Sequence, residues 1–379
     1  MKVIIASDSF KGSLSAVAAS KAIAEGVRRV VPKATLEIIP LADGGEGTVR
    51  ALVQARNGTL QKTVVKDPLG KDVEAEWGWL GNDATGIIEM AAASGLPLVP
   101  PEKRNPLLTT SYGTGQLVEA ALKKGCKKII LGIGGSATTD FGTGLAQALG
   151  VRFYREDGSE ITDFMNGCLM GMVHRIDMLA IDPRLYECEI FVACDVDNPL
   201  LGPHGAVYTY SPQKGATPEG CKKLERNMEK IAAVAQKKLR DVRSLPGAGA
   251  AGGMGGGLVV FFDAVLQSGI DLVLKACRFR ERAKRADLIF TGEGQIDEQT
   301  IFGKTIAGVG LLAKEIGVPV IGLSGAVKVS LSTMQKMGLT ACFSICNRPM
   351  TLKRSIGEAE SLLTETAAQV MKLVLLQMR

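Results

Sequence analysis

The sequence has little of the two residue types on which many catalytic and metal sites depend. Only two histidines occur, His174 and His204, and each is too isolated for a Ser-His-Asp arrangement. The eight cysteines include no CxxC pair, and no histidine cluster lies near them, so the pattern of a metal site is missing. The thiols are therefore expected to be free, and the chemistry to come from other residues.

Long apolar runs and basic blocks are also missing. The apolar run at the start of the chain is too short for a signal peptide, and residues 244–262 are uncharged but consist mainly of glycine and alanine. The net charge of +6 is spread along the chain without interleaved aromatics, which disfavours nucleic-acid binding. We expect a cytoplasmic protein that binds neither membranes nor nucleic acids, and the sequence leaves a homodimer open.

Glycine is the residue in excess, at 45 of 379 residues, about 12% against a usual ~7%. The glycines are clustered rather than dispersed, which indicates specialised loops instead of disorder. One concentration, residues 247–257, is expected to be a loop that precedes a helix over residues 258–266. The chain is 46% hydrophobic and 22% charged, and its length suffices for two domains with sizeable cores.

Alternating strand and helix patterns predict an α/β fold. Apolar runs at residues 3–6 and 35–40 are each followed by a loop and a helical pattern, which implies a parallel sheet with right-handed crossovers. Similar units recur near the end of the chain, whereas the middle is more irregular. We therefore predict one domain formed by residues 1–66 plus 285–379, an inserted domain over 67–284, and an active site in the cleft between them.

The stretch KKIILGIGGSATTDFGTGL, residues 127–145, reads as a buried strand, a glycine-rich loop and the start of a helix. Such a loop directs main-chain N–H groups outward at the positive end of a helix, where phosphate groups bind. The pattern thus predicts a phosphate-binding loop, and it leaves open which phosphate compound binds.

Four interpretations of the glycine-rich loops compete. They can be plain tight turns. Residues 132–137 satisfy G-x-G-x-x-A, with Glu156 about 20 residues on, as in dinucleotide-binding folds, but no hydride-chemistry residues accompany them. Residues 303–305 imitate the end of a P-loop, yet Glu298 stands where its first glycine should be.

The fourth interpretation is phosphoryl transfer on a different scaffold. This reaction needs hydrogen-bond donors around the phosphates, a cation, and carboxylates that hold Mg²⁺ and receive the alcohol proton. The sequence offers two cations, Lys11 and Lys304. Five acids follow predicted strand ends in equivalent places, namely Asp43, Asp195, Asp197, Glu293 and Asp297.

Nine motifs then identify a family. SDSFKGSLSA, IPLADGGEGT, EMAAASGL, EKRNPL, GIGGSATTD, CDVDNPL, PQKGATPE, GAGAAGGMG and TGEGQID occur in the order seen in bacterial glycerate kinases, so the chain resembles that family from residue 1 to about 326. The resemblance implies ATP-dependent phosphorylation of D-glycerate with Mg²⁺, typically giving 2-phosphoglycerate. It also implies a two-domain fold, one domain being Rossmann-like or flavodoxin-like, without a Walker A motif.

With this resemblance, the candidate residues receive roles. Lys11, Asp43 and Asp195 are assigned to catalysis, with Asp43 the rival of Asp195 as general base. Asp197 and Asp297 are assigned to the metal. Substrate binding is assigned to Asp8, Ser9, Glu46, Arg104 and Asn105, of which Arg104 fits the glycerate carboxylate as a guanidinium fork.

The ATP phosphates are expected either on residues 134–139 or on residues 252–257. The nucleotide-binding assignments are Gly134, Gly135, Ser136, Thr138, Thr139, Gly253, Gly255, Gly256, Gly292, Glu293 and Lys304. A kinase of another small hydroxy acid, an NAD(P)-dependent oxidoreductase that uses Glu156, and a non-catalytic sugar-acid sensor remain alternatives.

Overall fold

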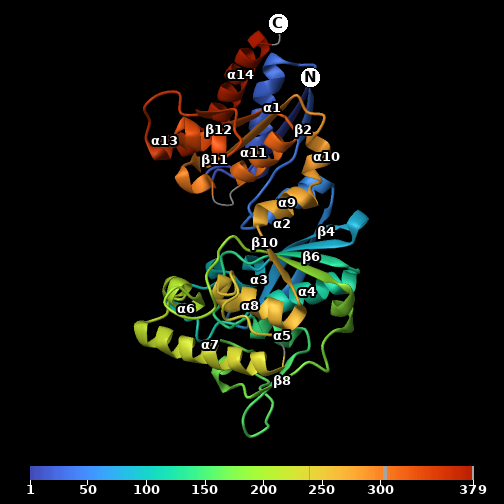
Figure 1. Cartoon of the computed structure of the whole chain (residues 1–379), viewed down its shortest axis with the longest axis vertical. Coiled ribbons are helices and arrows are strands. Elements are labelled where there is room, and N and C mark those ends of the chain that lie inside the picture. Colours follow the sequence, from blue (N-terminus) through green and yellow to red (C-terminus); the bar gives the residue numbers. More distant parts are fainter. Residues whose placement is uncertain (239, 302–304, 378–379) are drawn as a thin grey trace. The chain divides into compact units, whose positions relative to one another are not determined.

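The computed structural model describes residues 1–238, 240–301 and 305–377 (Figure 1). It divides into two compact units. Unit 1 comprises Met1–Asp43, Arg50–Gly58 and Gly269–Arg379, and unit 2 comprises Gly44–Val49 and Thr59–Ser268. The chain crosses between them earlier than residues 66 and 284, because the strand over 59–66 pairs within the sheet of unit 2 and two helices over 269–283 pack in unit 1.

Unit 1 is built on a five-stranded sheet in which all neighbouring strands are parallel. In sheet order the strands are β13 (Ala341–Ser344), β12 (Val320–Val327), β11 (Leu288–Ile296), β1 (Lys2–Ser7) and β2 (Thr35–Ile38). Val3, Ile4 and Ile5 are fully buried in succession, as expected for a strand covered on both faces by helices. This arrangement confirms the predicted α/β class.

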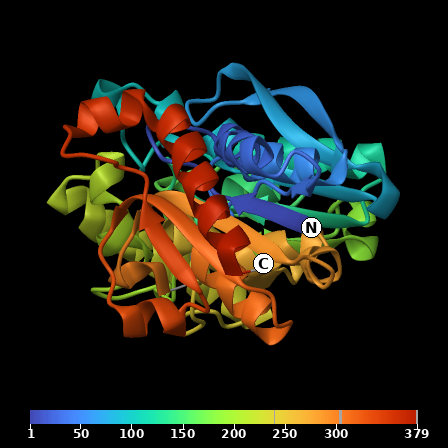
Figure 2. The ribbon, with the colours of Figure 1, turned by 90° about the horizontal axis from the view of Figure 1, so that it is seen from above.

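The longest helices of unit 1 are α1 (Ala16–Val30) and α14 (Ala359–Gln377), which pack together, as the blue and red helices of Figure 2 show. Ser15 caps α1 by accepting a hydrogen bond from Ala18 N. Gly26 makes the close packing possible, because a Cβ there would lie 2.2 Å from the carbonyl oxygen of Thr364. The other helices are α2 (Thr48–Arg56), α9 (Gly269–Ala276), α10 (Phe279–Ala283), α11 (Thr305–Glu315), α12 (Leu331–Lys336), α13 (Leu352–Gly357) and the 3₁₀ helix η7 (Glu298–Ile301).

Unit 2 contains a six-stranded mixed sheet. Its order is β10 (Val265–Gln267), β9 (Glu189–Ala193), β6 (Lys128–Gly132), β5 (Thr85–Glu89), β4 (Asp72–Leu80) and β3 (Thr59–Lys66). The first four strands are parallel to one another, and β4 runs antiparallel to both of its neighbours, β5 and β3. A separate ribbon pairs β7 (Arg152–Tyr154) with β8 (Arg175–Asp177).

The helices of unit 2 belong to two hydrophobic cores, one that contains side chains of the six-stranded sheet and one that contains side chains of the β7–β8 ribbon. These helices are α3 (Ala91–Ser94), α4 (Tyr112–Lys124), α5 (Thr143–Ala148), α6 (Ala206–Tyr210), α7 (Pro218–Lys238) and α8 (Ala250–Phe262). Short 3₁₀ helices are η1 (Gly81–Asp83), η2 (Leu96–Leu98), η3 (Pro101–Lys103), η4 (Leu169–Met172), η5 (Pro183–Glu187) and η6 (Pro212–Lys214).

Helix α8 corrects the sequence-based prediction of a loop over residues 247–257. The helical stretch begins at Ala250, with a left-handed kink at residues 251–253, and it ends before residue 266, where β10 follows. The loop prediction failed because glycine is needed here for close packing rather than for a turn. A Cβ on Gly257 would lie 1.9 Å from the carbonyl oxygen of Phe141. Within residues 247–257, Gly247 and the kink have the left-handed backbone expected of a glycine loop.

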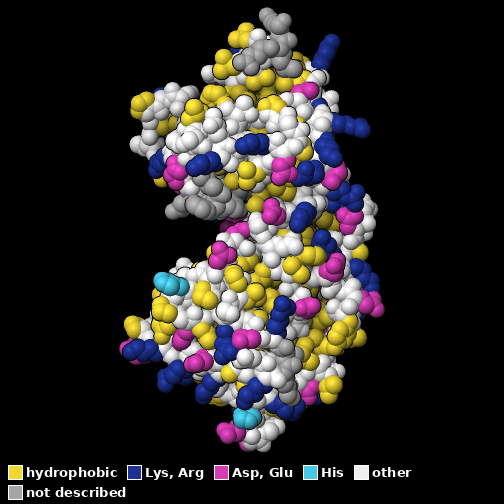
Figure 3. All heavy atoms as spheres, in the orientation of Figure 1, with side chains coloured by type: hydrophobic (Ala, Val, Ile, Leu, Met, Phe, Trp, Pro, Cys, Tyr) yellow, Lys and Arg dark blue, Asp and Glu magenta, His cyan; other side chains and the backbone are white. Residues whose placement is uncertain are grey.

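Charged side chains of both signs are interspersed on the face drawn in Figure 3. No continuous area of Lys and Arg is visible there, in keeping with the even spread of charge along the sequence. Within residues 1–238, 240–301 and 305–377, no helix is both long enough and apolar enough to cross a membrane.

Candidate functional site

Most of the predicted site residues lie at the carboxyl edges of the two sheets, where ligands bind in parallel α/β folds.

Asp8 is the central carboxylate of unit 1. It follows β1 directly, and its N–H donates to the carbonyl oxygen of Gly292 at 2.8 Å. Its side chain is only 9% exposed. One carboxylate oxygen accepts from Ser9 N at 2.5 Å and the other from Thr305 Oγ1, at the start of α11, also at 2.5 Å. Asp8 is therefore held in one orientation by two donors.

The pKa of Asp8 is raised, chiefly because burial penalises the charged carboxylate. The hydrogen bond from Thr305 acts in the opposite direction, and the negative charge of Asp43 raises the pKa further. Asp43 comes after β2, whose continuation is fixed by a hydrogen bond from Leu41 N to Ser7 O at 3.0 Å. Asp43 thus acts on Asp8 at this edge, which suits Asp8 as a group that accepts and releases a proton.

Glu293 lies beside this pair, since Ser7 pairs with Gly292 in the parallel ladder. It is 9% exposed and accepts from Thr300 Oγ1 at 3.1 Å. Asp297 donates its N–H to the same hydroxyl at 3.0 Å, and its carboxylate accepts from Gln295 Nε2 at 2.7 Å. The predicted metal ligand Asp297 is therefore part of the turn that leads into η7.

The other predicted site residues of unit 1 are Lys11, Gly292 and Lys304, and the first two do not share one environment. Lys11 is exposed and belongs to the turn after Asp8. Gly292 lies within β11, where a Cβ would come 2.6 Å from the carbonyl oxygen of Leu323, so this glycine serves sheet packing. Lys304 lies outside the described residues.

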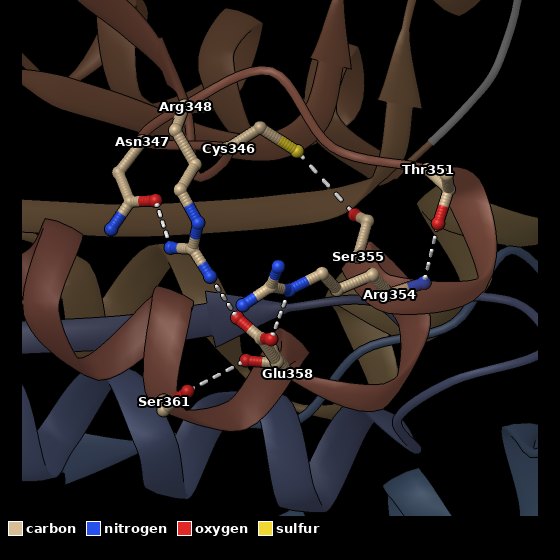
Figure 4. Close-up of polar contacts among 8 residues, drawn as sticks. All are labelled: Cys346, Asn347, Arg348, Thr351, Arg354, Ser355, Glu358 and Ser361. Carbon is tan, nitrogen blue, oxygen red and sulfur yellow. Dashed lines mark hydrogen bonds and ion pairs between the residues drawn. The ribbon is translucent and has the colours of Figure 1, made fainter.

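A further polar cluster in unit 1 contains none of the predicted residues. Glu358 accepts hydrogen bonds from Arg348 Nη2 and Arg354 Nε, both at 2.6 Å (Figure 4). The two guanidinium groups lower the pKa of Glu358. Glu358 stands between α13 and α14, so this cluster lies where the chain passes from one helix to the next.

In unit 2, the glycine-rich loop follows β6 as predicted. Gly134 and Gly135 are exposed, whereas Ser136, Thr138 and Thr139 are buried. Gly135 has φ +70°, which a residue with a side chain rarely adopts. Within the described parts of the chain, the N–H groups of residues 134–136 have no protein acceptor. Consecutive N–H groups of this kind form a concave binding site for an anion.

Two charged residues lie behind this loop, and the sequence reasoning assigned a role to neither. Lys214, only 2% exposed, donates from Nζ to Ser136 Oγ at 2.8 Å and to Thr138 O at 2.6 Å. Asp140, fully buried, accepts from Ser111 N at 2.9 Å and from Ser111 Oγ at 2.7 Å. Both residues occur in motifs of the family resemblance, PQKGATPE and GIGGSATTD, which was the available signal.

Asp195 and Asp197 follow β9 and are exposed. Because Gly132 pairs with Ala193, Asp195 and Gly134 lie equally far beyond the paired ends of neighbouring strands. The charges of both aspartates contribute to the raised pKa of Cys194, although burial of the thiol is the larger cause. The sheet therefore brings Asp195 and the loop to one edge.

The predicted substrate residues of unit 2 are placed by turns. Arg104 is half-buried, and its Nε donates to Val99 O at 3.3 Å. Asn105 accepts from Leu107 N at 3.1 Å, an Asx turn. Glu46 is exposed within the segment 44–49, of which Gly44 lies close to β6: a Cβ on Gly132 would be 2.3 Å from Gly44 O.

The second group of glycines, in residues 247–257, packs inside unit 2. Gly253, Gly255 and Gly256 are all buried. A Cβ on Gly255 would lie 2.3 Å from Gly247 O, and one on Gly252 would lie 2.2 Å from Thr138 O. Residues 252–257 thus pack against other segments, including the back of the first loop, and they offer less to a ligand than Gly134 and Gly135 do.

The described residues contain no group of three or more His, Cys, Asp or Glu side chains placed to hold a metal ion. Asp197 and Asp297, the two predicted ligands, belong to different units. Mg²⁺ is usually held by one or two carboxylates together with phosphates and water. The carboxylate oxygens at the edge of unit 1 fit that chemistry without a dedicated protein cage.

Comparisons with known proteins agree with one another. A family model described as the glycerate kinase family matches residues 3–375. A glycerate kinase of Halalkalibacterium halodurans is 48% identical over 97% of each chain, and a glycerate 2-kinase of Escherichia coli is 46% identical over 95% of this chain and 94% of its own. The crystal structure of a protein described as glycerate kinase 2 from Salmonella typhimurium LT2 is similar with a TM-score of 0.91 and 44% identity, over 100% of this chain and 99% of that one.

Proposed function

The chain belongs to the glycerate kinase family, and from this premise we propose that it transfers the terminal phosphoryl group of ATP to the 2-hydroxyl of D-glycerate in the presence of Mg²⁺. The observation that supports phosphoryl transfer most directly is the loop after β6. Gly134 and Gly135 are exposed there, and the N–H groups of residues 134–136 lack acceptors in the described chain. Phosphate oxygens would supply those acceptors.

The nucleotide phosphates are assigned to Gly134, Gly135 and Ser136. Mg²⁺ would neutralise charge on the transferring phosphoryl group, and carboxylates among Asp197, Asp297 and Glu293 would hold it. Asp43 and Asp195 are the alternative acceptors of the hydroxyl proton. Lys11 would face the transferring group, and Arg104 the glycerate carboxylate.

The raised pKa of Asp8 favours placing substrate beside it. A buried carboxyl that is oriented by Ser9 N and Thr305 Oγ1 can bind the glycerate hydroxyl and help to align it. Alignment is a large part of phosphoryl-transfer catalysis, because the transition state is loose and needs little covalent assistance.

The test is a coupled assay of ADP release with D-glycerate, Mg²⁺ and ATP, with the product identified by phosphorus NMR. The expected product is 2-phosphoglycerate alone. If 3-phosphoglycerate forms instead, the assignment to the 2-hydroxyl is wrong, but the protein is still a glycerate kinase. Phosphorylation of a different hydroxy acid, with no turnover of glycerate, would show that glycerate is not the substrate. Reduction of NAD(P) without ADP release would refute the proposed kinase activity.

A further inference from the structure

Lys214 is a lysine withdrawn from solvent. It ends η6, and Gly215, with φ +93°, turns the chain away from it. Burial of an ammonium group is unfavourable unless hydrogen bonds and an opposite charge compensate. Among the residues that the structure describes, the compensation comes from the segment around the glycine-rich loop, whose Ser136 and Thr138 lie 78 and 76 residues earlier in the chain.

Both hydrogen bonds of Lys214 hold this loop. Its Nζ reaches the hydroxyl of Ser136 at 2.8 Å and the carbonyl oxygen of Thr138 at 2.6 Å. The hydroxyl of Thr138 is buried and has no partner among the described residues, so Thr138 is held through its main chain. The lysine therefore fixes the conformation of residues 136–138 rather than a single rotamer.

The loop cannot relax backward. Gly252 lies directly behind it, so close that a Cβ there would be 2.2 Å from Thr138 O. Phe141 N also donates to Gly252 O at 3.3 Å. With its buried side fixed in this way, the loop exposes Gly134 and Gly135 on its other side.

Asp140 is the ionisable group that acts on Lys214, and burial raises the pKa of this carboxyl as well. Its carboxylate is oriented by Ser111 and by Gly142 N at 3.2 Å, and its charge favours the protonated lysine. Burial has the larger and opposite effect, so that the pKa of Lys214 falls to about 7. The lysine consequently changes its charge near neutral pH, while a neutral amine can still donate both hydrogen bonds.

We propose that Lys214 is a positioning residue for nucleotide binding: it holds residues 136–138 so that the N–H groups of residues 134–136 meet the phosphates, and its charge attracts them from behind the loop. This inference rests on the proposed function, because it takes the loop as the phosphate-binding element. It adds a residue that does not touch substrate and a dependence of nucleotide affinity on pH.

The experiment is calorimetric titration of MgATP into the full-length protein without glycerate. Lys214→Met removes the charge and both hydrogen bonds while keeping side-chain length. The expected result is a rise of about tenfold or more in the Kd for MgATP, since hydrogen bonds from a charged donor contribute roughly 1.5–3 kcal/mol. The Kd for D-glycerate should stay unchanged. Lys223→Met, an exposed lysine on α7, is the matched control and should bind like the wild type.

The pH profile separates positioning by a charge from a general structural effect. The affinity of the wild type for MgATP should fall as pH rises from 6 to 8.5, and the ratio of the two Kd values, variant over wild type, should fall with it. This ratio cancels the protonation of the nucleotide itself. A ratio of one at every pH would overturn the inference, and a large ratio that is independent of pH would overturn the role of the charge.

Ser136→Ala keeps the test decisive if Lys214→Met does not fold, which circular dichroism would show. It removes one of the two hydrogen bonds and leaves the lysine, so a rise of roughly threefold in the Kd for MgATP is expected. An unchanged Kd would count against the inference. Failure of the proposed function is distinguishable: the wild type itself would then bind no MgATP.

Discussion

The carboxyl edges of the two sheets differ in the polar groups that are buried at them. In unit 1, the buried acids Asp8 and Glu293 are each oriented by a threonine hydroxyl, from Thr305 and Thr300. In unit 2, the edge presents main-chain N–H groups, with Lys214 behind them. Related parallel topologies therefore produce two different edges: buried carboxylates in unit 1, and in unit 2 main-chain N–H groups over a buried lysine, with Asp195 and Asp197 exposed beside them.

The largest effect should follow from removing a charge at the edge of unit 1. Asp43→Asn should lower kcat roughly 10²–10⁴-fold, because a general base contributes about that much. The Kd for MgATP should change little, because the nucleotide phosphates are assigned to Gly134, Gly135 and Ser136 rather than to Asp43. Steady-state kinetics and MgATP titration measure the two quantities. Near-normal kcat would remove Asp43 from catalysis and leave Asp195, whose Asn variant is the parallel test.

The stability of the wild type should depend on pH through Lys214. Its pKa is about 7 in the folded protein against an ordinary 10.5, so between these values the unfolded chain holds a proton that the folded chain lacks. The free energy of unfolding should therefore rise with pH across this window. Relative to Lys214→Met, the gain should be on the order of a few kcal/mol. Urea unfolding at pH 7 and pH 9.5 measures it, and parallel pH dependence of the two proteins would contradict it.

The glycine-rich loop of unit 2 should respond in binding rather than in stability. Gly134→Val adds a side chain where the nearest atom to a Cβ is Gly45 Cα at 3.7 Å, an ordinary contact, so the fold should survive. The branched side chain would cover the N–H groups, and we expect about a tenfold rise in the Kd for MgATP, about 1.4 kcal/mol. Gly257→Ala is the contrasting variant. It forces a Cβ against Phe141 O, so it should lower thermal stability before it affects binding.

The smallest effects should come from substituting Thr305 and Asp140, which shift the pKa values of Asp8 and Lys214. Thr305→Val removes a hydrogen bond that lowers the pKa of Asp8, so the acidic limb of the kcat profile should move to higher pH. Asp140→Asn removes the charge that raises the pKa of Lys214, so the pH at which MgATP affinity declines should move lower. Shifts in the reverse directions would show that these groups do not control the profiles.

The sequence alone determined the α/β class and most of the elements that carry the site. Apolar runs followed by a loop and a helical pattern predicted β1 with α1, and the stretch over residues 127–145 predicted β6 with the glycine-rich loop. The nine motifs predicted the family, and the comparisons confirm it. These signals are local, since strand burial, helix capping and left-handed turns each depend on a few neighbouring residues.

Only the tertiary structure decided which polar groups act together. Residue spacing could not predict that Lys214 lies under Ser136, or that Thr305 holds Asp8, because these partners are 78 and 297 residues apart. The same limit explains the glycines. Gly134 and Gly257 share a composition signal, but whether a glycine faces solvent or admits a neighbouring backbone depends on the packing around it, which is set by segments distant in the sequence.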